Sequence, residues 1–316
     1  MRWSGLSKVL RRSNEPSNRD TAEWEQQGGD IAEELYYHGL LSLVDTDSLL
    51  PRAGDFLVRR TDIAGQRKLV LSVCSAPGTL QHYPILETNQ QDQCWISDDR
   101  KFANAALLIN TLHMTKSPVS KSNPNILLIR PIPRQEWEVR HDQIFTDKFL
   151  GTGNFTHTYR GIVLVDENRY QWVAVKKLLG DTFDRQKDFL QEMHSLRKLV
   201  HECVVKIVAV VSDREPVVLM EWMQGGSLLD TLRETLTMSD RQRVLYCTQI
   251  SQGMRHLEKS EVLHRNLAAR NCLLDWSGKQ LKVSDCGLGL LQKHHTEIGR
   301  LHWATKWMAP EYLTDS

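Results

Sequence analysis

The sequence lacks several patterns that mark particular classes of protein. Its six cysteines are scattered and show no CxxC or CxxxH spacing, which indicates a reducing compartment. Forty Lys and Arg nearly balance 39 Asp and Glu, so no net field favours nucleic acid, and any anion must be bound locally. No apolar run is long enough to span a membrane, no signal-type core is present, and Arg2 excludes N-myristoylation. We therefore expect a cytoplasmic protein without nucleic-acid partners or a transmembrane segment.

The organisation of the chain indicates two domains of the α+β class. The length of 316 residues, with 41% hydrophobic and 25% charged residues, is sufficient for two separate cores. The opening stretch is polar and has no sustained period, whereas a run containing two prolines and several charges interrupts the pattern further on. We expect a disordered tail over 1–34, a first domain over 35–130, a linker over 131–141 and a second domain over 142–316.

Hydrophobic periodicity predicts elements in both domains. Strand patterns cover 55–59, 68–73, 173–175, 204–211 and 217–220, and a helix pattern covers 102–112. Two further stripes at spacings of three and four predict helices whose apolar faces belong to the core. The first stripe comprises Phe189, Met193, Leu196 and Val200, and the second comprises Val244, Cys247, Ile250, Met254 and Leu257.

Three blocks in the first domain point to the recognition of a phosphate group. They are Tyr36-Tyr-His-Gly39, Asp55-Phe-Leu-Val-Arg-Arg-Thr61 and Gln81-His-Tyr83. An arginine on a strand is usually solvated, but an apolar run precedes Arg59 and His82 follows downstream. A guanidinium group is planar and always charged, so Arg59 could hold a phosphate through two parallel hydrogen bonds.

The order and spacing of these blocks resemble an SH2 domain. The resemblance implies a central antiparallel sheet flanked by two helices, and partners that carry phosphotyrosine. It also implies that Arg59, the Thr61 hydroxyl, the His82 ring and backbone amides near residues 62–65 form the phosphotyrosine pocket. Leu43 occupies the helix position where many SH2 domains carry a second arginine, so we expect affinity to depend more heavily on Arg59.

Ordered motifs in the second domain are typical of phosphoryl transfer from a nucleotide. A glycine-rich stretch over 151–156 would be a weak signal alone, because its third glycine is missing. It is followed in order by Val173-Ala-Val-Lys176, Glu192, His264-Arg-Asn-Leu-Ala-Ala-Arg-Asn271, Asp285-Cys-Gly287 and Ala309-Pro-Glu311. Together they resemble the protein-kinase signature set, in its tyrosine-specific form. An SH2 domain joined to such a kinase is similar to the Fes/Fer family of cytoplasmic tyrosine kinases.

The resemblance implies ATP and Mg²⁺ as cofactors and assigns a role to each motif. Lysine on the phosphates, a glutamate holding it and two metal-binding side chains supply most of the charge placement in this chemistry. The implied ATP-binding residues are Gly151, Gly153, Lys176, Glu192, Glu221 and Met223. The implied catalytic-loop residues are Arg265, Asn266 and Asn271, and the implied metal ligands are Asn271 and Asp285. The fold expected is a β-rich N-lobe and a helical C-lobe.

Several departures from the kinase pattern favour impaired catalysis. Asn266 stands where kinases carry the aspartate that accepts the substrate proton, and an amide is too weakly basic for that role. Thr156 replaces a glycine of the phosphate loop, and Cys286 replaces the phenylalanine behind the metal aspartate. No tyrosine lies between Asp285 and Glu311. The sequence ends at Ser316, five residues after Glu311, so we expect an incomplete, truncated C-lobe.

Three hypotheses follow from these motifs. The first is a phosphotyrosine-binding adaptor with an ATP-binding pseudokinase domain. The alternative is an active non-receptor tyrosine kinase that transfers the γ-phosphate of ATP to protein tyrosine. In the third, the second domain does not fold by itself. In each case we expect membrane association to be peripheral, with partners recruiting the protein to the inner face of the plasma membrane.

Overall fold

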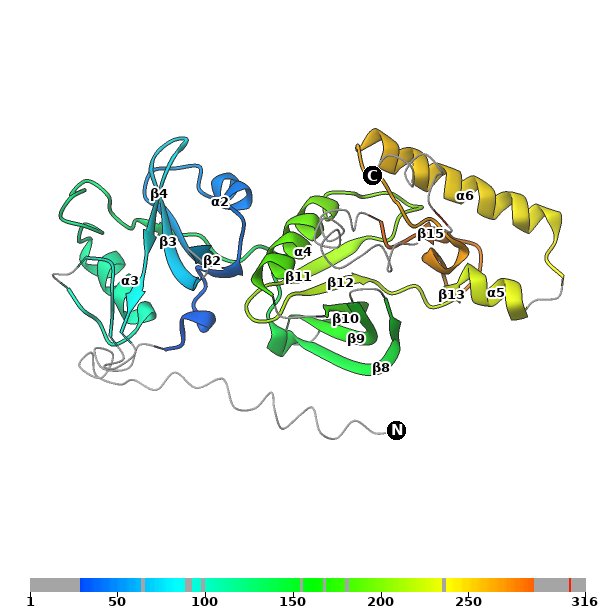
Figure 1. Ribbon diagram of the computed structural model, residues 1–316, viewed down its shortest axis with the longest axis horizontal. Coiled ribbons are helices and arrows are strands. Elements are labelled where there is room, and N and C mark those ends of the chain that lie inside the picture. Colours follow the sequence, from blue (N-terminus) through cyan, green and yellow to red (C-terminus); the bar gives the residue numbers. More distant parts are fainter. Residues whose placement is uncertain are drawn as a thin grey trace. The chain divides into compact units, whose positions relative to one another are not determined.

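The chain divides into two compact units: the first comprises the residues up to Arg134 together with Leu164–Tyr170, and the second comprises Gln135–Val163 and the residues from Gln171 onward. The computed structural model describes residues 29–63, 66–88, 93–97, 100–153, 156–166, 169–179, 182–234, 237–286 and 307. Both units combine sheets with helices (Figure 1), as expected for the α+β class.

The first unit is built on one five-stranded sheet with the order β1-β2-β3-β4, and β7 pairs with β2. Strands β2, β3 and β4 are antiparallel, whereas β1 and β7 each run parallel to β2. Helices α2 and α3 flank this sheet (Figure 1), so the SH2 architecture is confirmed. The strands are β1 Tyr37–Leu40, β2 Asp55–Ile63, β3 Gln66–Ala76, β4 Thr79–Pro84, β5 Leu86–Glu87, β6 Cys94–Trp95 and β7 Arg130–Pro131. The helices are η2 Ile31–Glu33, α2 Leu43–Leu49 and α3 Ala105–Thr115.

Alternation along β2 separates the core of this unit from its polar face. Phe56 and Val58 point into the core, where they meet the buried side of α3. Because successive side chains on a strand point to opposite faces, Leu57, Arg59 and Thr61 share the other face. The sheet therefore presents Arg59 away from the main core.

The second unit contains a five-stranded sheet with the order β11-β12-β10-β9-β8 and a small sheet β13-β14-β15. The larger sheet consists of β8 Ile144–Thr152, β9 Thr156–Asp166, β10 Arg169–Leu178, β11 Ile207–Val211 and β12 Val217–Glu221. The smaller sheet consists of β13 Gly226–Ser227, β14 Cys272–Leu274 and β15 Leu281–Val283. The helices are η3 His141–Gln143, α4 Phe183–Leu196, α5 Leu228–Glu234, α6 Asp240–Lys259 and η4 Ala269–Asn271. A sheet-rich lobe followed by a lobe with few helices agrees with the expected kinase fold.

The predicted apolar faces of α4 and α6 are partly wrong. Val200 lies beyond the end of α4 and is 67% exposed, and on α6 Val244 is 65% exposed and Cys247 is exposed too. The buried residues of α6 are Tyr246, Gln249, Gly253 and Leu257.

Hydrogen bonds to the β14–β15 hairpin explain the buried face of α6. The Tyr246 hydroxyl donates to the Gly278 carbonyl at 2.7 Å. The Gln249 side chain donates to the Lys279 carbonyl and accepts from the Leu281 amide. Polar side chains therefore select this face, which a count of apolar residues misses.

Residues 135–143, part of which we expected as a linker, belong to the second unit and pack against its α4 and β11. The Trp137 ring lies 4.8 Å from the His194 ring of α4, and the Arg197 guanidinium lies 3.9 Å from the centre of the Trp137 ring. The Val210 amide of β11 donates to the Trp137 carbonyl at 2.8 Å. This segment thus connects α4 with the edge of the larger sheet.

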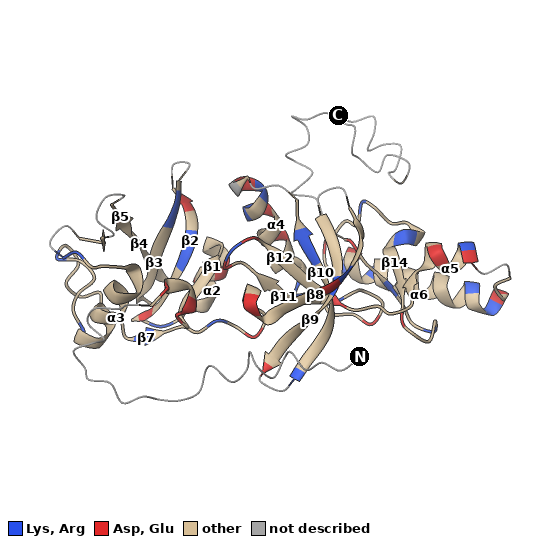
Figure 2. Ribbon diagram, turned by 90° about the horizontal axis from the view of Figure 1, so that it is seen from below, with Lys and Arg blue, Asp and Glu red and all other residues tan. Residues whose placement is uncertain are grey.

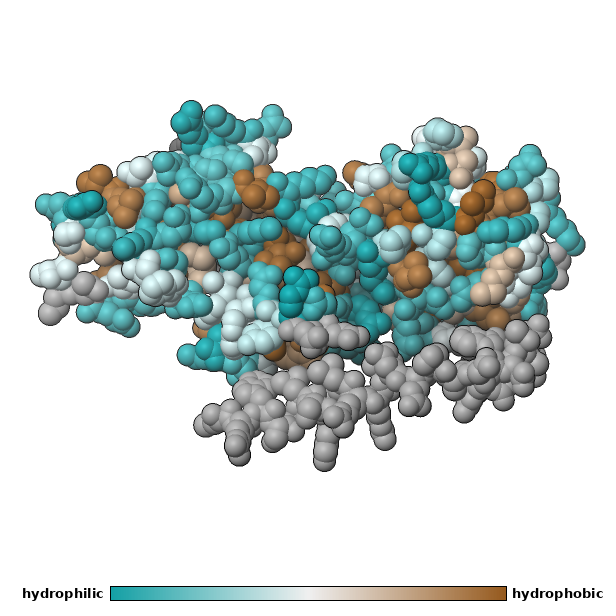
Figure 3. All heavy atoms as spheres, turned by 180° about the vertical axis from the view of Figure 1, so that it is seen from behind, coloured by the Kyte–Doolittle hydropathy of each residue, from teal (hydrophilic) through white to brown (hydrophobic). Residues whose placement is uncertain are grey.

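Charged positions of both signs are distributed along the described parts of the chain. Acidic and basic residues are interspersed on both units (Figure 2), in keeping with the net charge of +1. On the face drawn in Figure 3, hydrophobic residues occur in separate patches among hydrophilic ones. None of the helices in the described ranges is long and apolar enough to cross a membrane.

Candidate functional site

The first candidate site is centred on Arg59, a buried cation on β2. Its side chain is 3% exposed and donates from Nε to Ser72 Oγ at 3.2 Å and from Nη1 to the Leu41 carbonyl at 3.3 Å. Burial lowers the pKa of Arg59 to about 10, so the group is still charged at neutral pH. No carboxylate in the described part of the chain forms an ion pair with it. A buried charge held only by neutral groups is well suited to bind an anion.

Neighbouring side chains on β3 and β4 extend this candidate site. His82 Nδ1 lies 2.9 Å from Ser72 Oγ, so one hydroxyl connects His82 with Arg59. The pairing of β2 with β3 places Thr61 opposite Lys68 on the same face. Thr61 and His82, both expected here from the sequence, therefore lie on the Arg59 face. Part of the expected 62–65 turn, Ala64 and Gly65, lies outside the described residues.

Sequence reasoning missed Ser72 and Lys68 as pocket residues. Both lie on the Arg59 face of β3, because Ser72 pairs with Leu57 and Lys68 with Thr61. Their alternation along β3 is visible in the sequence, but the choice of face depends on the register with β2.

The start of α2 contributes no second arginine to the pocket. Leu43 is the first residue of α2 and is 57% exposed. Ser42 caps this helix by accepting a hydrogen bond from the Asp45 amide, and the preceding Leu41 carbonyl accepts from Arg59. The helix start therefore orients Arg59 through a backbone carbonyl while presenting an apolar side chain beside it.

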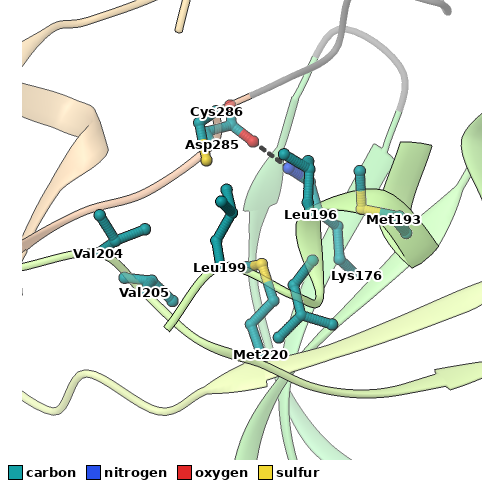
Figure 4. A pocket seen from close by; sticks show the side chains of 10 residues that line it. Lys176, Met193, Leu196, Leu199, Val204, Val205, Met220, Asp285 and Cys286 are labelled. Atoms are coloured by element: carbon teal, nitrogen blue, oxygen red, sulfur yellow. Dashed lines mark hydrogen bonds and ion pairs between the residues drawn. The ribbon is translucent and has the colours of Figure 1, made fainter. Parts of the chain in front are cut away.

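The second candidate site lies in the kinase-like unit, where Lys176 on β10 forms an ion pair with Asp285 (Figure 4). Burial raises the pKa of the Asp285 carboxyl, but the Lys176 ammonium outweighs this effect and the net shift is downward. Asp285 has a φ of 63° and Arg265 a φ of 61°, a left-handed conformation that is uncommon outside glycine. Such backbone conformations cluster at functional sites.

Glu192 and Cys286 lie close to this ion pair. Burial raises the pKa of the Cys286 thiol to about 11, and the carboxylates of Asp285 and Glu192 act in the same direction, whereas Lys176 opposes them. The structure thus brings Lys176, Glu192 and Asp285 together around one thiol, which stays protonated at neutral pH.

A small cavity of about 30 Å³ lies beside this cluster (Figure 4). Lys176, Asp285 and Cys286 contribute to its lining, and the other lining residues are Met220 and apolar residues of α4, β11 and the segment between them. Cys286, at the position where kinases carry a phenylalanine, contributes a small side chain to this lining.

The catalytic-loop residues form a hydrogen-bonded group around Asn266. The Arg270 guanidinium donates to Asn266 Oδ1 at 2.6 Å, and the Asn271 side chain donates to the Asn266 carbonyl at 2.7 Å. The Asn266 amide donates to His264 Nδ1 at 3.3 Å, and burial lowers the pKa of His264. Asn266 is therefore ordered, but its side-chain oxygen is an amide oxygen and a poor base.

The glycine-rich stretch connects β8 with β9. The Gly153 amide donates to the Thr156 carbonyl at 2.7 Å, and Thr156 is 2% exposed. Gly151 lies on β8, and a Cβ there would meet no atom within 4 Å. Asn154 and Phe155, between the two strands, lie outside the described residues, as do Gly287 and the Ala309-Pro-Glu311 motif.

Glu221 and Met223 lie where β12 passes into the second lobe. The Glu221 amide donates to the Lys206 carbonyl at 2.9 Å. Its carboxylate accepts from Lys282 Nζ at 2.7 and 2.8 Å, which joins β12 to β15. Met223 is buried, and its carbonyl accepts from the Gly226 amide. The Glu221–Lys282 pair, which the sequence motifs do not reveal, thus holds the larger sheet to the smaller one.

Removing either partner of this pair should destabilise the second unit. Both side chains are partly buried, 17% exposed for Lys282 and 31% for Glu221, so Lys282→Met leaves the Glu221 carboxylate without its cation and should cost about 1 kcal/mol of unfolding free energy. Glu221→Gln should cost a similar amount, and the double variant less than the sum. Urea denaturation of the unmodified chain, the two single variants and the double variant measures the coupling between the two residues. Strict additivity would show that the pair contributes nothing.

The residues of this unit fit a magnesium nucleotide. Within the described ranges, no three His, Cys, Asp or Glu side chains gather to hold a metal ion alone. Mg²⁺ in kinases needs only one or two protein ligands, because substrate phosphates supply the others. Asp285 and Asn271 would hold the metal, which neutralises developing phosphate charge, and Lys176 would contact the phosphates.

Comparison with known families agrees with both halves of the structure. Residues 36–112 match the SH2 domain, and residues 144–316 match the family described as protein tyrosine and serine/threonine kinase. The chain therefore belongs to the protein kinases that carry an SH2 domain, in the group of Fer-related non-receptor tyrosine kinases.

Individual relatives support this assignment. Fer-related kinase 1 of Caenorhabditis elegans is 31% identical over 289 residues, which cover 90% of this chain and 73% of that protein. Tyrosine-protein kinase Fer of Homo sapiens is 33% identical over 90% of this chain and 34% of its own length. The tyrosine-protein kinase transforming protein Fps of Fujinami sarcoma virus is 28% identical over 90% of this chain and 32% of its own length. The chain thus spans about a third of the length of Fer and Fps.

Proposed function

We propose that this chain binds tyrosine-phosphorylated proteins through its SH2 domain. The observation that carries the proposal is the buried Arg59, held by Ser72 and the Leu41 carbonyl and without a carboxylate partner among the described residues. A phosphotyrosine phosphate supplies the missing anion, and Thr61, Lys68 and His82 on the same face add polar and basic contacts.

Isothermal titration of the whole chain with a phosphotyrosine peptide tests this function. We expect saturable binding that free phosphotyrosine competes away and that weakens as salt is added, because the contact is electrostatic. Binding that survives excess free phosphotyrosine would show that the peptide occupies another surface.

We propose that the kinase domain binds ATP with Mg²⁺ but transfers phosphate poorly, so that the protein acts as a signalling adaptor. Lys176, Glu192 and Asp285 support nucleotide binding because they converge around Cys286. Asn266 supports impaired transfer because it occupies the position of the general base. A thermal melt with and without Mg-ATP tests nucleotide binding and also whether this domain folds. Stabilisation by Mg-ATP is expected, and its loss in Lys176→Met would locate the nucleotide.

The alternative is an active tyrosine kinase. The hydrogen bonds within the catalytic loop favour it, because Asn271 and Arg270 both bind Asn266. The Lys176–Asp285 ion pair is also in place. Transfer of radiolabelled phosphate from ATP to a Glu/Tyr copolymer separates the two proposals. Transfer by the unmodified chain that disappears in Lys176→Met would establish the active kinase.

The cellular location follows from these proposals. A chain of this kind would work in the cytoplasm and reach the inner face of the plasma membrane by binding phosphorylated partners. In cells, Arg59→Ala should remove any such recruitment without changing the amount of protein.

A further inference from the structure

Ser72 lies between Arg59 and His82, the two basic side chains of the proposed phosphotyrosine site. It is fully buried on β3. Its Oγ accepts a hydrogen bond from Arg59 Nε at 3.2 Å and lies 2.9 Å from His82 Nδ1. A single hydroxyl thus orients a guanidinium and an imidazole at once.

The hydrogen bonds of Ser72 determine where the imidazole proton of His82 lies. Because Oγ accepts from Arg59, the hydroxyl hydrogen needs an acceptor, and leaving it unsatisfied in a buried site would be costly. Among the described residues, the acceptor within reach is His82 Nδ1. In the free protein His82 is therefore neutral, with its proton on Nε2.

We propose that phosphotyrosine binding at this pocket is coupled to the uptake of a proton by His82, with Ser72 as the positioning residue. The coupling rests on the proposed function, because it requires a phosphate beside Arg59. A bound dianion stabilises the imidazolium, so a proton from solvent adds to Nδ1. Nδ1 then donates to Ser72 Oγ, which accepts from both cations, and the hydroxyl hydrogen turns from Nδ1 to an oxygen of the bound phosphate.

The charges around His82 agree with this coupling. Burial lowers the pKa of His82 in the free protein, the Arg59 cation on β2 lowers it further, and Asp47 on α2 opposes both. Lys68 lies on the same face of β3. A phosphate offsets the Arg59 cation, so the pKa of His82 should be higher in the complex than in the free protein.

The direction of the pH dependence follows from this shift. Affinity should rise as the pH falls from the bound-state pKa of His82 to its free-state pKa, because only the complex gains the proton in that range. The phosphate opposes this below its own second pKa of about 6, where it becomes a monoanion. Near neutral pH the phosphate remains a dianion, so proton uptake measured there reports His82 and not the phosphate.

Two measurements on the whole chain test the coupling. Nitrogen NMR of chain labelled with ¹⁵N-histidine, with His82→Gln to assign the signal, reports the protonation of each ring nitrogen. We expect unprotonated Nδ1 in the free protein and a higher pKa of His82 at saturating phosphotyrosine peptide. Calorimetry near neutral pH in buffers of different ionisation enthalpy should show net uptake of up to about one proton per peptide.

Variants of Ser72 distinguish a positioning role from a merely structural one. Ser72→Ala should allow the proton to occupy either ring nitrogen of free His82 and should reduce the proton uptake on binding. Ser72→Thr keeps the hydroxyl, so it should retain the proton on Nε2 in the free chain and the proton uptake on binding. Saturable peptide binding that leaves the pKa of His82 unchanged would overturn the coupling but not the proposed function. A protonated Nδ1 in the free chain would do the same. Failure of the peptide to bind would instead contradict the proposed function and the coupling with it.

Discussion

Replacement of Arg59 by alanine is expected to lower the affinity of the chain for a phosphotyrosine peptide by about 30- to 5,000-fold. Truncation of a buried, hydrogen-bonded charge typically costs about 2–5 kcal/mol of binding free energy, and each 1.4 kcal/mol is a factor of ten. The loss should be near the upper end, because Leu43 supplies no second arginine. Fluorescence anisotropy with a labelled peptide measures the two dissociation constants.

Arg59→Lys is the matched control for this experiment. It keeps the positive charge but loses the planar fork, so its affinity should lie between those of the alanine variant and the unmodified chain. Arg67→Ala, at an exposed position on β3, should leave affinity within about threefold. Equal affinities for the Arg59→Ala chain and the unmodified chain would show that the phosphate binds elsewhere.

Replacement of Asn266 by aspartate is expected to raise phosphoryl transfer to tyrosine by about 10²- to 10⁴-fold. This is the typical contribution of a positioned general base. The substitution preserves size, and Arg270, which donates to Asn266 Oδ1 at 2.6 Å, would remain a partner for the carboxylate. Initial rates with ATP, Mg²⁺ and a Glu/Tyr copolymer measure the change in kcat.

Lys176→Met in the Asn266→Asp background is the control, because it removes the phosphate contact and should abolish the gained activity. Asn266→Ala tests the opposite direction. If alanine lowers the rate by about 10²- to 10⁴-fold, Asn266 already acts as fully as a general base, and the impaired-kinase proposal is then wrong. An unchanged rate in Asn266→Asp with Mg-ATP bound would place the defect elsewhere, with Thr156 and Cys286 as the next residues to restore.

The identity of the site residues could be predicted from the sequence, but their contacts could not. Arg59, Lys176 and Asp285 stand in motifs whose order along the chain is informative. Ser72 and Lys282 belong to no such motif, and their roles arise from pairing between distant segments. Ser72 reaches Arg59 because β2 and β3 pair in one register, and Lys282 reaches Glu221 because β15 lies beside the end of β12.

Local patterns predicted the elements better than their buried faces. The strands containing Arg59 and Lys176 were expected from β-branched and aromatic residues, and both exist with longer bounds. On α6, however, Val244 is exposed while Gln249 is buried. Gln249 gains hydrogen bonds to the backbone of the β14–β15 hairpin, so packing against a neighbour outweighs the apolar count.

A titration with paired peptides tests the central claim most directly. The whole chain is mixed with a labelled pool of tyrosine-containing peptides in phosphorylated form and, separately, with the same pool unphosphorylated, and anisotropy is followed to saturation. If the chain reads phosphotyrosine through the Arg59 pocket, only the phosphorylated pool will saturate, and free phosphotyrosine will reverse the signal. Equal binding of the two pools, or no binding of either, would contradict this function.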